Sequence, residues 1–131
     1  MIILRRTLKA GAALLLVTFV PLGAAPRTVL EMLGQQPVVD TAWLRMFAVA
    51  GVVLALLHIL VAHRIQDVWW WSWAFALFDA GVATVAIVNA TLGLPKGSTA
   101  WPWLLFGGVS LVFLALYLIG LARAGREKPF V

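Results

Sequence analysis

Apolar residues occupy four long runs of this chain, and short polar segments separate the runs. The runs cover residues 9–25, 42–62, 68–92 and 101–122. Each is long enough for a helix that crosses the hydrocarbon core of a bilayer. The sequence shows no internal repeat and no heptad pattern. We therefore predict an all-α integral membrane protein, in which residues 1–131 form a single four-helix bundle domain with short loops.

The first run also has features of a signal peptide, because Arg5, Arg6 and Lys9 precede a short apolar core. Cleavage after Ala25 would leave Pro26 directly past the cut, where proline usually blocks processing. We expect a retained helix that Pro21 kinks or ends. The sequence leaves open whether the run is ever cleaved.

The connections between the runs carry recognisable helix starts. A helical turn is expected after Pro26, and Asp40 or Thr41 is expected to cap the second span. Ser98 or Thr99 could cap the fourth span, with Pro102 in its first turn. The segments 63–67 and 93–99 are short, which favours antiparallel neighbours, in particular for the second and third spans.

Basic residues are distributed unevenly between the two ends of the predicted bundle. Seven belong to the side of the termini and three to the other side, where they are Arg27, Arg45 and Lys96. The positive-inside rule then places both termini in the cytoplasm. The expected location is a bacterial cytoplasmic membrane. Two interfacial tryptophan belts are also expected: an inner one of Trp69, Trp70, Trp71 and Trp73, and an outer one of Trp43, Trp101 and Trp103.

The composition agrees with a chain that is solvated by lipid. Apolar residues make up 63% of it and charged residues 11%, and there is no cysteine, which excludes disulfides and iron–sulfur clusters. The net charge of +5 lies at the span ends, where lipid headgroups explain it better than nucleic acid does. The expected partners are membrane lipids and other membrane subunits or further copies of this chain.

Small residues form a stripe along one face of the second span and of the third span. The stripe of the third span holds one acid, Asp79, and consists of Ser72, Ala76, Asp79, Ala83, Ala86 and Ala90. The stripe of the second span holds His58 and consists of Leu44, Ala48, Gly51, Ala55, His58 and Ala62. Small faces let helices approach closely in lipid, so we expect the two stripes to face each other.

Four polar residues of the spans are predicted to form a cluster inside the bundle. They are Asp79, His58, Tyr117 and Ser110. At about 1.5 Å per residue, His58 and Tyr117 reach similar depths, and Asp79 lies nearer the middle of the bilayer. The cluster is either a ligand-binding or proton-responsive pocket, or a hydrogen-bond network that fixes helix register. A second candidate pair, Arg45 and Asn89, lies near the outer side, although Arg45 could instead snorkel or pair with Asp40.

Other chemistries find little support in the sequence. His58 and His63 are five residues apart and do not share a helix face. They therefore cannot bind one metal ion together or provide both axial ligands of one haem. No catalytic or phosphate-binding motif is present, and we predict no metal and no cofactor. The four-span layout is similar to that of small multidrug exporters and of DoxX-like and BphX-like membrane proteins, in topology alone. The first span lacks the acidic residue of the exporters.

Two functions remain after these exclusions, and the balance is against an enzyme. The first is a non-enzymatic accessory or assembly subunit of a larger membrane complex. The alternative is a binder or carrier of a small hydrophobic ligand, such as a lipid, a quinone or a drug-like cation, through Asp79 and its polar neighbours. An opening at Asp79 would favour the binder, whereas a stripe covered by the second span would favour a structural role.

Overall fold

The computed structural model describes residues 1–38 and 40–128, and every regular element in this part of the chain is helical. The long helices are α1 (Ile2–Ala24), α3 (Ala42–His63), α5 (Ser72–Val88) and α6 (Trp101–Glu127). Shorter elements are α2 (Pro26–Met32), α4 (Ile65–Val68), the 3-10 turn η1 (Trp69–Trp71) and the π-helical turn η2 (Asn89–Gly93). Four segments are long and apolar enough to span a membrane, the third being Ile65–Gly93. The predicted all-α bundle of four apolar spans is confirmed.

Several predicted helix bounds need correction. The first span begins at Ile2 instead of residue 9, because Leu4, Thr7 and Leu8 extend its buried face. The fourth continues past residue 122 to Glu127, because Ala124 is fully buried. Pro21 lies inside α1 and does not end it. The second span ends at His63 instead of residue 62, and the third covers 65–93 instead of 68–92.

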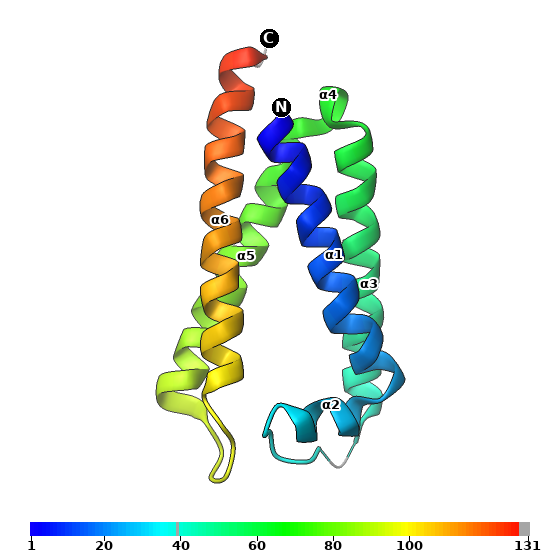
Figure 1. The fold of residues 1–131 in the computed structure, drawn as a ribbon, viewed down its shortest axis with the longest axis vertical. Helices are drawn as coiled ribbons and strands as arrows, with labels where there is room; N and C mark the ends of the chain where they lie inside the picture. The colour runs from blue at the N-terminus through cyan, green and yellow to red at the C-terminus, as the bar shows by residue number, and fades with distance from the viewer. Residues whose placement is uncertain (39, 129–131) are drawn as a thin grey trace.

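The spans pack as two antiparallel pairs, α1 with α3 and α5 with α6, and α1 also contacts α6 (Figure 1). The expected packing of the second span against the third is therefore wrong. The small stripe of α3 instead packs against α1. The Phe19 ring of α1 covers Gly51 of α3, and Gly23 of α1 lies against Ala48 of α3. The small stripe of α5 receives α6, where Gly107 lies against Ala86. Both stripes are packing faces, as predicted, but each has a different partner.

The shared core of the two pairs lies near the termini. It includes one or more residues from each span and consists of Leu4, Leu8, Val61, Ala62, Ile65, Trp69, Phe75, Ala76, Tyr117, Leu121 and Ala124. Within α1 the buried residues stop at Ala12, halfway along the helix. From this level the α1–α3 pair and the α5–α6 pair diverge toward the other end of the molecule (Figure 1).

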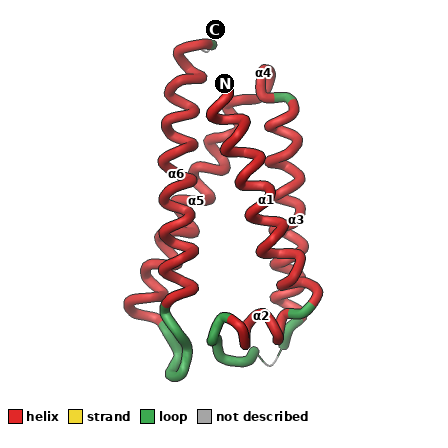
Figure 2. The backbone as a smooth tube through the Cα atoms, in the orientation of Figure 1, coloured by secondary structure: helices red, strands yellow, loops and turns green. Residues whose placement is uncertain are grey.

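The longer loops gather at that other end and join the two pairs by hydrogen bonds (Figure 2). The Thr99 hydroxyl donates to the Leu33 carbonyl (2.9 Å), and the Gln35 amide donates to the Thr99 carbonyl (3.0 Å). The Trp103 indole donates to Gln35 Oε1 (3.1 Å). Ser98 and Thr99 are thus not caps of the fourth span, whose cap position is Ala100. Their hydroxyls bind the segment that follows α2 instead.

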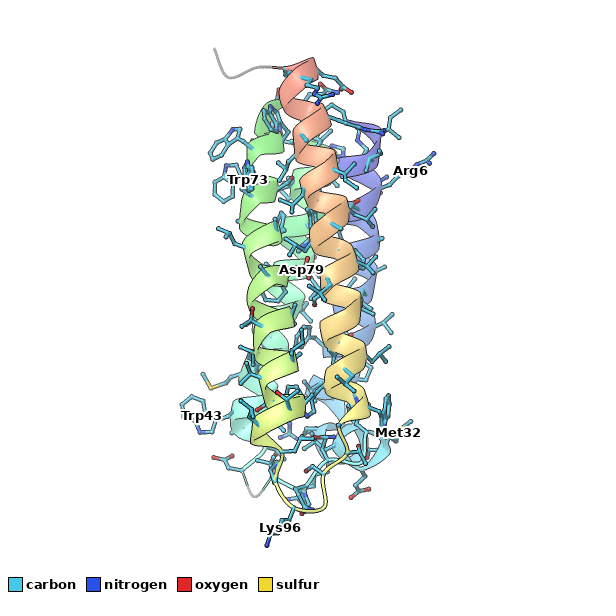
Figure 3. The ribbon with its side chains drawn as sticks, turned by 90° about the vertical axis from the view of Figure 1, so that its left-hand side faces the viewer. Arg6, Met32, Trp43, Trp73, Asp79 and Lys96 are labelled. Atoms are coloured by element: carbon cyan, nitrogen blue, oxygen red, sulfur yellow. The ribbon has the colours of Figure 1, made fainter. Side chains whose placement is uncertain are left out.

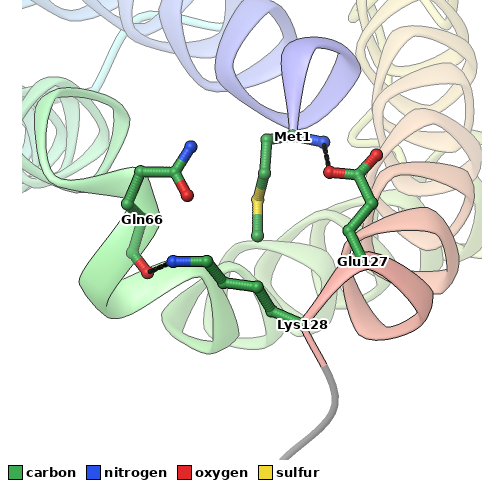
Figure 4. Close-up of polar contacts among 4 residues, drawn as sticks. All are labelled: Met1, Gln66, Glu127 and Lys128. Atoms are coloured by element: carbon green, nitrogen blue, oxygen red, sulfur yellow. Dashed lines mark hydrogen bonds and ion pairs between the residues drawn. The ribbon is translucent and has the colours of Figure 1, made fainter.

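At the opposite end, polar contacts close the bundle around the termini (Figure 4). The amino group of Met1 forms an ion pair with Glu127 (2.9 Å), and the Lys128 side chain donates to the Gln66 carbonyl (3.1 Å). These contacts connect the start of α1 to the end of α6, and the end of α6 to α4. They add to the apolar core that lies directly beneath them.

Candidate functional site

All four spans meet around two aromatic residues, Phe75 and Tyr117, and the imidazole of His58. The ring centroids of His58 and Phe75 are 3.8 Å apart, and those of His58 and Tyr117 are 6.3 Å apart. The first span takes part through Gly11, whose absent Cβ would lie 3.0 Å from Tyr117 Oη and 3.1 Å from His58 Cδ2. A glycine at this position lets both rings lie against the backbone of α1.

His58 makes one hydrogen bond, from Nδ1 to the Leu54 carbonyl (2.8 Å). A carbonyl only accepts, so Nδ1 carries the proton, and in the neutral imidazole Nε2 is left as an acceptor. Tyr117 is fully buried, and within the described residues its hydroxyl has no hydrogen-bond partner. An unpaired buried hydroxyl costs about 1–3 kcal/mol, so it requires a packing or functional explanation.

Asp79 lies one helical turn beyond Phe75 and is half-buried between α5 and α6 (Figure 3). Its carboxyl is within hydrogen-bonding reach of the buried Ser110 side chain and close enough to Tyr117 to interact electrostatically. In residues 1–38 and 40–128 no cationic side chain pairs with it, since the two ion pairs there involve Glu127 and Asp67. Asp79 therefore has one polar neighbour within reach and spare capacity to accept further hydrogen bonds.

The four residues predicted to cluster thus divide into two sets that share Tyr117. One set is His58 with Tyr117, and the other is Asp79 with Ser110 and Tyr117. Across the described residues no hydrogen bond or ion pair joins His58 to Asp79. The reason is the pairing of the helices: α5 packs along α6 and meets His58 of α3 at Phe75, with ring centroids 3.8 Å apart, whereas Asp79 lies one turn farther along α5. The small stripe of α5, which contains Asp79, is covered by α6 and not by α3, the second span.

The predicted outer pair of Arg45 and Asn89 is not brought together. Arg45 is exposed in the first turn of α3, on the α1–α3 pair, and Asn89 begins η2 at the far end of the α5–α6 pair. The two pairs are well separated at this level (Figure 1). The alternative pairing of Arg45 with Asp40 is also absent from the described structure. Asp40 Oδ1 accepts from the Ala42 amide (2.8 Å), but the cap position of α3 is Thr41, and its side chain makes no capping hydrogen bond.

Sequence reasoning missed three contributors to these sites. Gly11 admits the rings of His58 and Tyr117, and the small residues around it could have signalled a close helix contact in the first span. Phe75 stacks on His58, but one phenylalanine in an apolar run carries no such signal. Arg27 lines a cavity together with Arg45, and the two lie far apart in sequence. Among the described residues, no group of three histidine or acidic side chains could hold a metal ion.

Comparisons with known proteins gave no significant match to a family model, a curated protein or a solved structure.

Proposed function

We propose that this chain binds an amphipathic small molecule that carries a cationic or hydrogen-bond-donating group, with Asp79 as the polar contact. An acidic residue near the middle of a span costs about 2.5–3.5 kcal/mol on the insertion scale, and such residues usually serve packing or function. Packing does not account for Asp79, because it is only half-buried and has no cationic partner in the described chain.

The position of Asp79 carries the proposal. It lies directly beyond the level of Phe75 and Tyr117, where all four spans meet, and on the side toward which the two helix pairs diverge (Figure 1). A molecule that inserted its apolar part between the pairs would bring its polar group to Asp79. The apolar side chains of Leu15 and Leu16 in α1 and of Phe106 and Val109 in α6 are only half-buried, which leaves apolar surface for such a body.

The chemistry of the contact favours a cation over a neutral quinone or lipid. A carboxylate in low dielectric gains most from a positive charge, and Ser110 supplies at most one hydrogen bond to it. The ligand class that fits is therefore a lipophilic cation or an amine with an apolar body.

The test uses the purified chain in lipid nanodiscs with tetraphenylphosphonium as the probe. Asp79→Asn keeps the shape of the side chain and removes the charge, and we expect it to weaken binding by roughly tenfold or more. Thr84→Val is the matched control, because Thr84 is an exposed polar residue of the same helix. Its hydroxyl donates to Ala80 O (2.8 Å) and to no other group among the described residues. Equal binding by wild type and Asp79→Asn, with both folded, would reject the proposal.

A second candidate, an accessory subunit of a larger membrane complex, is favoured by two exposed glycines. Gly81 of α5 and Gly108 of α6 have no atom within 4 Å of the place where a Cβ would lie. Glycine is a costly helix residue, and on a lipid-facing surface it permits close approach of another helix. We expect Gly108→Leu to shift the chain to smaller species on native gels after mild extraction. The control is Ala50→Leu, at an exposed site of α3.

We also propose that both termini face the cytoplasm of a bacterial cell. The support is the uneven distribution of basic residues and the position of both termini at one end of the bundle (Figure 1). Because the chain has no cysteine, Lys96→Cys gives a single label site in the exposed loop at the other end. Labelling of this cysteine only from the cytoplasm would contradict the orientation.

A further inference from the structure

A cavity of about 400 Å³ lies where α1, α2 and α3 meet, at the loop end of the bundle. Its wall includes two arginines from different elements, Arg27 of α2 and Arg45 of α3, and two threonines, Thr28 and Thr41. Residues 24–26 complete it. None of the residues that line this cavity belongs to α5 or α6, so it is separate from the Asp79 site.

The cationic groups of this cavity are available to a ligand. In the described part of the chain neither Arg27 nor Arg45 forms an ion pair, although Glu31 follows one turn after Arg27 and Asp40 precedes α3. The side chain of Thr41, at the cap position of α3, makes no capping hydrogen bond. Two arginine forks with neighbouring hydroxyls match the oxygens of a phosphate group, which arginine binds in a bidentate manner.

Apolar surface leads from the cavity toward the middle of the membrane. On α1, Ala24 lines the cavity, and Val20 and Val17 follow on the same face, 54% and 73% exposed. On α3, Val49 and Val53 follow Arg45 on its face, 64% and 50% exposed. A molecule with a phosphate in the cavity and acyl chains along these two rows has the layout of a phospholipid.

We propose that this junction binds the phosphate of an anionic phospholipid headgroup through Arg27 and Arg45. The site belongs to the leaflet at the loop end, at the depth where Trp43 marks the interface (Figure 3). The arginines and hydroxyls would hold the headgroup, and the valine rows would contact its chains. Free inorganic phosphate shares the headgroup chemistry, but it would make no use of the apolar rows.

The test measures lipid retained by the full chain during detergent washing, by native mass spectrometry. Phosphatidylglycerol is supplied in one arm and diacylglycerol, which lacks the phosphate, in the other. We expect retention of phosphatidylglycerol and a loss of roughly tenfold in the double variant Arg27→Gln/Arg45→Gln. The matched control Arg5→Gln/Arg6→Gln removes two exposed charges at the other end and should retain the lipid.

Two results would overturn the proposal. One is an equal loss of phosphatidylglycerol in both double variants, because bulk charge would then explain its binding. The other is thermal protection by inorganic phosphate that depends on Arg27 and Arg45, without preferential retention of phosphatidylglycerol, because the cavity would then be an anion site and not a lipid site. Lys96→Gln, which removes the remaining basic side chain at the loop end, should leave retention unchanged.

Discussion

At the end that carries the termini, all four spans share one apolar core, whereas at the loop end hydrogen bonds connect the two helix pairs. The core holds fully buried side chains such as Leu4 and Leu8 from α1 and Tyr117 from α6. The loop contacts include Thr99 with Leu33 and Trp103 with Gln35. Each such bond contributes only about 0.5–1.5 kcal/mol, since water competes for its groups.

This difference indicates where the bundle can open. Close packing of small and apolar residues is the main source of helix association in lipid, and between the two pairs it is concentrated at the end that carries the termini, here called the closed end. The loop end depends on a few exposed bonds, which is typical of segments with low local stability. Asp79 lies between the shared core and the loop end. A ligand that binds there, as proposed, would not have to disrupt the shared core.

The largest expected effect comes from breaking the closed end at Gly120. A Cβ there would lie 3.0 Å from Leu4 Cδ1 and 3.3 Å from Leu4 Cα, so Gly120→Leu would force α6 away from α1. Overpacking of this kind costs about 1–3 kcal/mol and occasionally more. We expect a clear drop in the thermal midpoint of the purified chain.

Ala122→Leu is the matched control for that variant, because Ala122 is an exposed residue of the same helix, two positions from Gly120. The monomer should tolerate it with little change in thermal midpoint. If both variants melt alike, the α1–α6 contact is not what holds the two pairs together.

The prediction of the spans from sequence succeeded because a long run of apolar residues favours lipid over water whatever its neighbours in the fold are. The run alone therefore identifies the span. The small stripes were also found correctly, since Gly51 and Ala86 both lie in close helix contacts. Their partners could not be predicted, because a small face fits any helix that can approach it. Ile65 and Trp69 of the linking segment between α3 and α5 are also buried and belong to the core, which the sequence did not indicate.

The polar cluster shows the same limit. The depth of a residue along a span follows from the helical rise, and this estimate placed His58 level with Tyr117. In the structure the ring centroids of the two residues are 6.3 Å apart. The direction in which Asp79 points depends on which helix covers its stripe, and that information was missing. Likewise, nothing in the sequence relates Arg27 to Arg45 until α1, α2 and α3 are packed together.

An intermediate effect is expected from loosening the loop end with Thr99→Val. This change removes the hydroxyl that donates to Leu33 O (2.9 Å) and keeps the side-chain volume. We expect a loss of about 0.5–1.5 kcal/mol and faster amide exchange in residues 33–36 and 96–99, with unchanged exchange at the closed end. Uniform acceleration along all four spans would show that the two ends do not open independently.

The smallest effect, and the one with a distinctive sign, concerns the hydroxyl of Tyr117 inside the closed end. Because this group is buried without a partner in the described structure, Tyr117→Phe should leave stability unchanged or raise it by up to about 1 kcal/mol. The same hydroxyl would crowd a methyl group at residue 11, at 3.0 Å. Gly11→Ala should therefore cost less in the Tyr117→Phe background than in the wild type, and a double-mutant cycle on thermal stability measures the difference. A loss of more than about 1 kcal/mol in Tyr117→Phe alone would mean that the hydroxyl is hydrogen-bonded in the membrane. Nε2 of His58, which also lies against Gly11, is an acceptor that could serve.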